Sequence, residues 1–405
     1  MNSRERVKAA LHFTKPDKIP KISLMNFAGL ISSDALFSTI FPPKAWQPGW
    51  RENEVGLFPH WFMEGIFPYL WKKPEWVKKD PKYKNWKNLP HEELDEWGGI
   101  WNVSGKHDTM GHPGRPSLPD WSKVYDYIGT YFLNPDDKQR YQIALIENNL
   151  FGRGKYRMFH IGWGPFMIAS DMRGFTNFLI DHRRNSDKVK YLLGKITDVY
   201  IKVMKNAKKL DNKIDGFFLV EDLGTQDRPF MKTGMFEEFY QPVYGTLIET
   251  AHDLGCEFHQ HCCGKIDPII PLFVTWGLDA FEFDSPRMCG YADLRPFRGK
   301  MMFWACINIQ TIYTRGTAAE CEHEVWHMMR NLGTPDGGFG AYYYPQPRHI
   351  KSPAENIKAF TSGLKKYGSY ATIPTEWWMS AVQDDAWHVN GMDVVPPLPG
   401  KSSIK

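Results

Sequence analysis

The segment from Phe258 to Gly264 reads Phe-His-Gln-His-Cys-Cys-Gly and contains the residues best suited to chemistry. His261 and Cys263 follow an apolar run, so an imidazole and a thiolate would lie side by side where a strand ends. Zn²⁺ binds such nitrogen and sulfur ligands, and a catalytic zinc site needs three protein ligands with a fourth position open. The alternative is that His261 is a hydrogen-bonded core residue and that Cys262 and Cys263 are small buried hydrophobes.

Composition excludes several other functions. The chain has 405 residues and a net charge of +4, from 50 Lys and Arg against 46 Asp and Glu, and the charges are interspersed. No basic tract suggests nucleic-acid binding. The first residues contain no apolar leader, and no segment is long enough to span a membrane, so we expect a cytoplasmic protein without membrane contact.

The cysteine and aromatic residues point to a site in the second half of the chain. All six cysteines lie between positions 256 and 321, which is not the spread of a disulfide framework. In a reducing compartment, such a group is more often metal-binding or catalytic. Aromatic residues make up 15% of the chain, including 16 Trp and 18 Tyr, so we expect some of them to line an apolar pocket.

Strand and helix patterns alternate along the chain and predict an α/β fold. Apolar, β-branched and aromatic runs predict strands at Ile19–Leu24, Met158–Ile161, Gly216–Val220, Glu257–His261, Asp279–Phe283, Met302–Ile307 and Gly338–Tyr343. Between them, helices are predicted at Asp187–Leu210, Phe236–Leu254, Ala318–Leu332 and Pro353–Tyr367, the last with Ser352 as N-cap. This number of units predicts one (β/α)₈ TIM barrel over residues 1–405.

Two stretches lack this alternation. Residues 42–127 are dense in Trp, Pro and Gly and are predicted to form an aromatic-rich N-terminal insertion or lid. Residues 369–405 are predicted to form an irregular C-terminal tail that wraps the barrel or a second subunit, as in a homodimer.

In a barrel, the polar residues that follow each strand are the candidates for function. Glu221 and Asp222 follow one strand, His261 and Cys263 the next, and Asp284 the one after. Neighbouring strands lie about 4.8 Å apart, so Glu221, His261, Cys263 and Asp284 could bind one ion. Glu221 could instead pair with a nearby arginine, and the two aspartates could be turn residues.

The ends of other predicted strands carry side chains suited to binding rather than to acid-base chemistry. Hydrogen-bonding and aromatic groups are predicted to line a substrate pocket at Trp163, Asn308, Gln310, Tyr342, Tyr344 and Gln346. Core packing is the alternative role for each aromatic residue.

With these residues in view, the chain resembles the uroporphyrinogen decarboxylase superfamily, and within it the corrinoid-dependent methyltransferase branch. The resemblance covers nearly the whole length. It is carried by Ser3–Val7, Pro16–Pro20, Glu96–Gly98, Met172–Gly174, Glu221–Gly224, His261–Gly264, Gly316–Thr317 with Glu320, and Pro353–Ile357. It implies a (β/α)₈ barrel, in agreement with the alternation of strands and helices.

The chain departs from the decarboxylases of that superfamily, which carry arginines after the first strand to bind the acidic groups of a tetrapyrrole. Here Ser23–Leu30 contains no arginine. A polyanionic substrate would lack its counter-charges, so porphyrin decarboxylation is not expected.

The chain also departs from the methyltransferases, in which the resemblance implies zinc bound by the His-x-Cys-Gly turn and a later cysteine. His261 and Cys263 match the first two ligands, but the position expected for the third lies near Gln346, where there is no cysteine. The site is therefore either rebuilt with Glu221 or Asp284, with or without His349, or lost. Oxygen ligands would leave a more Lewis-acidic ion, suited to a substrate oxygen.

The sequence hence predicts an O-demethylase-like methyltransferase. Zinc would polarise the oxygen of a methoxylated, aromatic compound while the reduced cobalt of a partner corrinoid protein takes the methyl group, with Glu221 or Asp222 placing or protonating the leaving oxygen. Three alternatives stay open: methyl transfer from the corrinoid to a thiol, a decarboxylase-like lyase, and a binding subunit without metal.

Overall fold

The structure is a computed structural model, and it describes residues 1–23, 33–43, 57–59, 89–104, 111–345, 347–370, 387–389 and 392–394. The chain forms two compact units, one of Met1–Ser38, Ile146–Gly162 and Asp211–Lys405, the other of Thr39–Leu145 and Trp163–Leu210. We describe each unit by itself. The predicted single domain over residues 1–405 stays a prediction.

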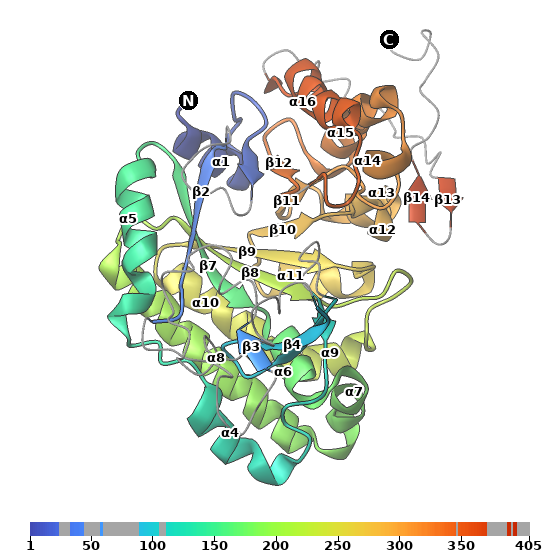
Figure 1. The fold of residues 1–405 in the computed structure, drawn as a ribbon. Coiled ribbons are helices and arrows are strands. Elements are labelled where there is room, and N and C mark those ends of the chain that lie inside the picture. Colours follow the sequence, from blue (N-terminus) through green and yellow to red (C-terminus); the bar gives the residue numbers. More distant parts are fainter. Residues whose placement is uncertain are drawn as a thin grey trace. The chain divides into compact units, whose positions relative to one another are not determined.

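The first unit is built on a sheet of eight strands, coloured from blue to orange in Figure 1. In chain order these are β1 (Lys21–Ser23), β2 (Ala35–Thr39), β7 (Tyr156–Trp163), β8 (Gly216–Asp222), β9 (Glu257–Cys263), β10 (Ala280–Phe283), β11 (Met302–Ala305) and β12 (Phe339–Tyr343). Their order in the sheet is β1-β12-β11-β10-β9-β8-β7-β2. Neighbours from β8 through β12 to β1 pair in parallel.

The two outermost strands approach each other where they begin. The backbone N–H of Asp34 donates to the carbonyl of Lys21 at 2.7 Å, and the backbone N–H of Lys21 donates to the Asp34 carboxylate at 2.9 Å. The eight parallel strands thus form a nearly closed barrel, which confirms the predicted (β/α)₈ TIM-barrel fold. Strand β2 is the one that the sequence patterns missed.

Helices of the same unit cover the sheet. They are α1 (Ser3–Leu11), α9 (Thr233–Tyr240), α10 (Thr246–Asp253), α11 (Ile270–Thr275), α12 (Pro286–Cys289), α13 (Tyr291–Leu294), α14 (Ile312–Arg315), α15 (Ala318–Leu332) and α16 (Ala354–Tyr367). Figure 1 shows α15 and α16 side by side, and α15 also contacts β11 and β12. Helix α15 begins at a capping box, in which Thr317 and Glu320 satisfy each other's backbone N–H groups.

Two helix predictions need correction. The helix predicted over Phe236–Leu254 is divided into α9 and α10 by a π-helical turn at Gln241–Gly245, which contains Pro242. Proline has no backbone N–H, so the regular hydrogen-bond ladder is interrupted there. The predicted N-cap Ser352 is also wrong by one residue, since Pro353 precedes α16 and no side chain caps the helix.

Bulky side chains fill the barrel interior. Trp304 on β11 is fully buried and lies opposite Gly340 of β12. A Cβ atom at position 340 would approach the Trp304 ring to 2.1 Å, so only glycine fits there. The Trp304 indole N–H donates to His259 Nδ1 at 3.1 Å, which satisfies two buried polar groups at once.

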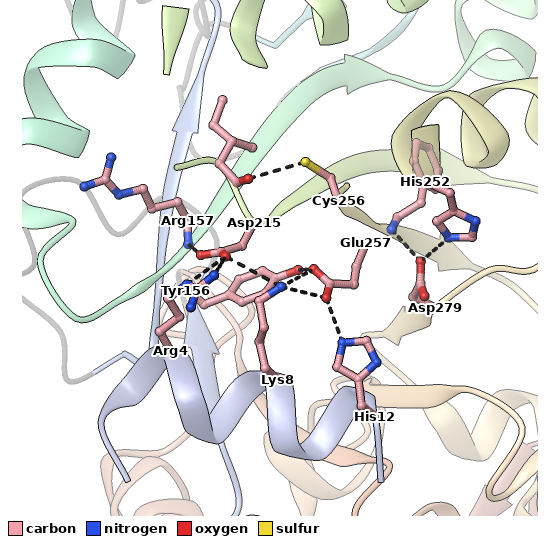
Figure 2. A network of polar contacts seen from close by, with 12 residues as sticks. Arg4, Lys8, His12, Tyr156, Arg157, Asp215, His252, Cys256, Glu257 and Asp279 are labelled. Carbon is pink, nitrogen blue, oxygen red and sulfur yellow. Dashed lines mark hydrogen bonds and ion pairs between the residues drawn. The ribbon is translucent and has the colours of Figure 1, made fainter. Parts of the chain in front are cut away.

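Helix α1 lies against the starts of strands β8 and β9 (Figure 2). Arg4 and Lys8 of this helix, and His12 directly after it, point toward carboxylates at the starts of β8 and β9. Arg4 donates to Asp215 at 2.8 Å, and Lys8 and His12 contact one oxygen of Glu257 at 2.8 and 2.9 Å. Because this is the end of the barrel opposite the usual active site, we assign the network to stability.

Replacing Glu257 by glutamine is expected to lower the free energy of unfolding by about 2 kcal/mol. This is less than the cost of breaking a fully buried ion pair, since Lys8 and His12 are partly exposed. Burial alone would raise the pKa of Glu257, but Lys8 and a hydrogen bond from Tyr156 hold that pKa below the ordinary 4.5. The carboxylate therefore stabilises the fold above pH 4.5, and this contribution is lost as the pH falls through the lower, folded-state pKa.

Urea unfolding of the wild-type protein and of E257Q across this pH range tests the prediction. The difference between the two should shrink as the pH falls. The matched control is E249Q, which makes the same change at an exposed position of α10 and should unfold like wild type. Equal midpoints for E257Q and wild type at pH 7 would contradict the assignment.

The second unit holds a small sheet of order β3-β4-β5-β6 and several helices. Its strands are β3 (Leu57–Pro59), β4 (His91–Leu94), β5 (Ile100–Val103) and β6 (His112–Pro113), and its helices include α4 (Val124–Tyr131), α6 (Pro165–Arg173), α7 (Phe175–Arg184) and α8 (Ser186–Leu210). Helix α5 (Gln142–Phe151) continues from this unit into the other. Trp97 packs edge-on against Phe132 and Tyr200, and Arg140 forms a buried ion pair with Glu96.

The predicted insertion at 42–127 includes this small sheet, but residues 44–56, 60–88 and 105–110 lie outside the described residues. In the predicted tail at 369–405, the described part beyond residue 370 is an antiparallel hairpin of β13 (Trp387–Val389) and β14 (Met392–Val394). Both assignments stay predictions. None of the helices in the described ranges has the length and apolar character needed to cross a bilayer.

Candidate metal centre

The register of three neighbouring strands decides which side chains share the barrel interior. Asp222 of β8 is paired with Cys263 of β9, and His261 of β9 is paired with Glu282 of β10. Paired residues of parallel strands point to the same face, and faces alternate along each strand. His261, Cys263, Asp222 and Glu282 therefore lie on one face, together with Asp284 two residues beyond Glu282.

Asp222, His261 and Cys263 each offer one potential ligand atom, and these atoms lie close together. Their donor atoms all lie within 4.8 Å of one another. His261 Nε2 is 3.3 Å from Cys263 Sγ and 3.8 Å from Asp222 Oδ1. Ligands of one tetrahedral zinc ion, with bonds of 2.0–2.3 Å, are separated by roughly 3.3–3.8 Å, so the spacing suits such an ion.

His261, Glu282 and Asp284 form a second group of three that shares the same imidazole. Glu282 is fully buried, and its Oε2 forms a short hydrogen bond with His261 Nδ1. A carboxylate on the far nitrogen of a metal-binding histidine fixes the tautomer and leaves the other nitrogen free to bind. Glu282 is thus placed to orient His261, and Asp284 Oδ2 lies 3.9 Å from Cys263 Sγ.

Burial and mutual charge shift the pKa values in this cluster. Burial raises the pKa of the Cys263 thiol to about 12 and that of Glu282 to about 7, while His261 opposes both shifts. Burial would lower the pKa of His261, but Cys263 and Glu282 raise it well above 6.5. Without a metal, Cys263, Glu282 and His261 therefore all hold their protons more tightly than they would in water.

The donor set fits a zinc ion. It offers an imidazole nitrogen, a thiolate sulfur and carboxylate oxygens, which are the ligands that Zn²⁺ takes in proteins. Glu282 Oε1 and Asp284 Oδ1 are also buried without a hydrogen-bond partner among the described residues. Buried acceptors of this kind are costly unless a donor or a cation satisfies them.

Glu221, predicted both as a ligand and as a catalytic group, lies elsewhere. It is paired with Cys262, on the face of β8 that points away from the interior. It is fully buried, and its Oε2 accepts a hydrogen bond of 2.6 Å from the Tyr244 hydroxyl. Glu221 belongs to neither group of potential ligands.

The predicted pocket residues are placed in different surroundings. Asn308 is fully buried, and its Oδ1 accepts from the backbone N–H groups of Gln310 and Thr311, so it shapes the turn after β11. Oε1 of the Gln310 side chain accepts from Nε2 of the Gln226 side chain at 3.2 Å, which links the loops after β8 and β11. Trp163 belongs to the second unit, where the Tyr200 hydroxyl donates to its carbonyl.

Two predicted tyrosines lie toward the metal centre. Burial, followed by the charge of Asp284, raises the pKa of both Tyr342 and Tyr344. The next contribution comes from Glu282 for Tyr342 and from Cys263 for Tyr344. Gln346 lies outside the described residues, and His349 is exposed and belongs to neither group of potential ligands.

Sequence reasoning missed His160 on β7. Its ring lies 6.2 Å from that of Phe218, which alternation places on the interior face of β8. Burial lowers the pKa of His160 to about 4, and the nearby charge of His261 acts in the same direction. A histidine inside a predicted strand gave no separate signal, because the phase of that strand is not visible in its sequence.

Comparison with known proteins finds one matching family model and similar solved structures. The family model of uroporphyrinogen decarboxylase (URO-D) matches residues 154–365. No curated protein matches the chain. Among solved structures, a methyltransferase from Methanosarcina mazei is similar, with a TM-score of 0.51 and 14% sequence identity over 91% of this chain and 99% of that one. At this identity, the likeness concerns the fold.

Proposed function

Because the chain belongs to the uroporphyrinogen decarboxylase family, we propose that it is an enzyme of the methyltransferase branch of that family. It would take the methyl group of a methoxylated, aromatic substrate and pass it to the reduced cobalt of a partner corrinoid protein. The similar Methanosarcina structure is that of a methyltransferase, which supports this branch. The family model alone does not determine which reaction the chain catalyses, since proteins of one fold catalyse several different reactions.

The observation that carries the proposal is the mixed ligand set at the ends of β8, β9 and β10. Cys263 supplies one sulfur, His261 one nitrogen and Asp222 one oxygen, and Asp284 Oδ2, 3.9 Å from Cys263 Sγ, offers a further oxygen. These residues would hold zinc. When bound, the ion would act as a Lewis acid toward an oxygen atom of the substrate.

The absence of arginine in Ser23–Leu30 argues against a tetrapyrrole substrate. Tyr342 instead lies two residues beyond Gly340, on the interior face of β12, and the charge of Asp284 acts on both Tyr342 and Tyr344. An aromatic ring packs well against such side chains. A neutral methoxyarene therefore suits this interior better than a polyanion.

The proposed methyl transfer is a nucleophilic displacement at the methyl carbon of the ether. The methyl carbon leaves the ether oxygen, the C–O electron pair stays on that oxygen, and a methyl–cobalt bond forms as cobalt(I) is oxidised to cobalt(III). The products are a methylated corrinoid and a phenolate, which becomes a phenol when it gains a proton.

The chain's own side chains would orient the substrate. Glu282 positions His261 through its hydrogen bond, and Asp222 borders solvent, with its side chain 44% exposed. Of the two predicted catalytic carboxylates, Asp222 faces the interior and Glu221 faces away. We therefore assign placement of the leaving oxygen to Asp222.

The test is anaerobic visible spectroscopy of the zinc-loaded protein with reduced corrinoid and a panel of methoxyarenes, methanol and methylamines. The proposal predicts loss of the cobalt(I) band with methoxyarenes and release of one phenol per methyl-corrinoid formed. Reaction only with methanol or methylamines would redirect the substrate class. If no donor reacts, even with a corrinoid protein supplied, the methyl-donor assignment is wrong.

A second experiment tests methyl transfer in the opposite direction, from the corrinoid to a thiol. Pre-formed methyl-corrinoid is incubated with the protein and a small thiol, and the return of cobalt(I) is followed. Turnover in this arm alone would favour thiol methylation, and the ligand set with only one sulfur predicts that it stays slow.

A further inference from the structure

Helix α15 carries a second arrangement of potential ligands, away from the strand ends described above. Its residues 323–327 read His-Glu-Val-Trp-His. In an H-E-x-x-H segment the two histidines are four positions apart, so they share one face of the helix. A chance match is common for so short a pattern, so its surroundings decide its meaning.

The two imidazoles are buried and lie against each other. His323 is 5% exposed and His327 is 8% exposed. Their ring centroids are 4.6 Å apart, with the ring planes at 86°. The Nε2 atoms of both rings are buried and have no hydrogen-bond partner among the described residues. Two buried nitrogens at helical spacing, both without a partner among the described residues, are thus available to bind one common ligand.

Glu324, the central glutamate of the segment, is committed to other contacts. It is fully buried and accepts two hydrogen bonds from Arg287, at 2.6 and 2.8 Å, and one from the Tyr291 hydroxyl at 2.6 Å. A general base must reach a water molecule and accept its proton. Glu324 cannot do so while its oxygens are occupied, so hydrolysis of the kind seen in H-E-x-x-H proteases is not expected.

Three cations lie near the pair, and two of them are paired with carboxylates. Arg287 is compensated by Glu324, and Lys366 forms an ion pair with Glu322 at 2.8 Å. Arg330 stacks over Trp326 on the same helix. Burial, more than these cations, lowers the pKa of His323 to about 4 and that of His327 to about 2, so both rings are neutral at pH 7.

We propose that His323 and His327 bind a divalent transition-metal ion such as Ni²⁺, Cu²⁺ or Zn²⁺, at a site independent of His261 and Cys263. Neutral imidazoles suit these ions. Among the described residues, no third histidine, cysteine or carboxylate completes a three-ligand group with this pair. Solvent or a small ligand would fill the other positions, so the ion should exchange faster than one held at Cys263.

The experiment uses the full chain carrying H261A and C263A, which lacks the first centre, after chelator treatment. Equilibrium dialysis against buffer that contains Ni²⁺, followed by metal analysis, should find about one equivalent bound. Adding H323Q and H327Q should remove that equivalent. Adding H112Q instead, at an exposed histidine of β6, should leave it in place.

A measurement on the otherwise intact pair covers the case in which the glutamine variants fail to fold. Cu²⁺ bound to the H261A/C263A protein should show electron paramagnetic resonance couplings to two imidazole nitrogens. No bound metal in this protein, or binding that persists in folded H323Q/H327Q, would overturn the inference. Either result is read independently of methyl transfer, so it leaves the proposed function untouched.

Discussion

Replacing Cys263 by alanine is expected to remove zinc from the protein and to lower the rate of methyl transfer by at least about 10³-fold. The thiolate is the one sulfur ligand in the proposed set, and it lies 3.3 Å from His261 Nε2. Loss of a Lewis acid that is worth several kcal/mol at the developing oxygen charge accounts for this factor. The effect should appear in kcat, because the interaction grows as the bond breaks.

The adjacent cysteine provides the control. Cys262 is buried on the same strand but points to the opposite face, where it is paired with Glu221. C262A removes the same atoms and should keep its zinc and its activity, with a loss of stability at most. Zinc content and initial rates of cobalt(I) loss would be measured for both variants. Equal zinc in C263A and C262A would show that Cys263 is not a ligand.

The second large effect is expected for Glu282→Gln. The Glu282 carboxylate accepts the hydrogen bond from His261 Nδ1 and is fully buried. Partners of this kind contribute about 10- to 100-fold to metal affinity or activity. We therefore expect E282Q to bind zinc about 10- to 100-fold more weakly, as measured by competition with a chromogenic chelator.

Glu221→Gln makes the same chemical change on the other face of the barrel wall. Its carboxylate contacts Tyr244, and an amide oxygen can accept that hydrogen bond as well. Zinc affinity in E221Q should match wild type. The opposite ranking, with E221Q weakened and E282Q unchanged, would mean that Glu221 is a ligand and that the register argument is wrong.

Much of the fold was readable from the sequence. The alternation of apolar strands and amphipathic helices predicted the barrel, and the polar residues after the strands predicted which loops meet. Cys263 contacts both His261 and Asp284 because parallel strands end at the same edge of the sheet. These predictions depend on chain order and on local pattern, which the sequence contains directly.

The choice between Glu221 and its neighbours depended on strand phase, which the sequence does not show. Strands in a parallel barrel are buried on both faces, so their residues form continuous apolar runs instead of an alternating pattern. Phe217, Phe218 and Leu219 on β8 are all fully buried. Pairing with β9 supplied the phase, and it turned Asp222 inward and Glu221 outward.

The short strand β2 and the π-helical turn in front of α10 escaped prediction for a different reason. Strand β2 has only five residues, Ala-Leu-Phe-Ser-Thr, which is too short a run to show a clear strand pattern. The helical pattern continues through Pro242 without a break in its apolar spacing. Tertiary packing determines such features more than local propensity does.

Zinc K-edge X-ray absorption of the zinc-loaded protein tests the central claim most directly. The claim is that the ends of β8, β9 and β10 form one zinc centre with a single sulfur ligand. The account predicts one sulfur at about 2.3 Å, with nitrogen and oxygen ligands at about 2.0–2.2 Å, and loss of the sulfur contribution in C263A. A zinc shell without sulfur in the wild-type protein, or a protein that retains no zinc, would contradict it.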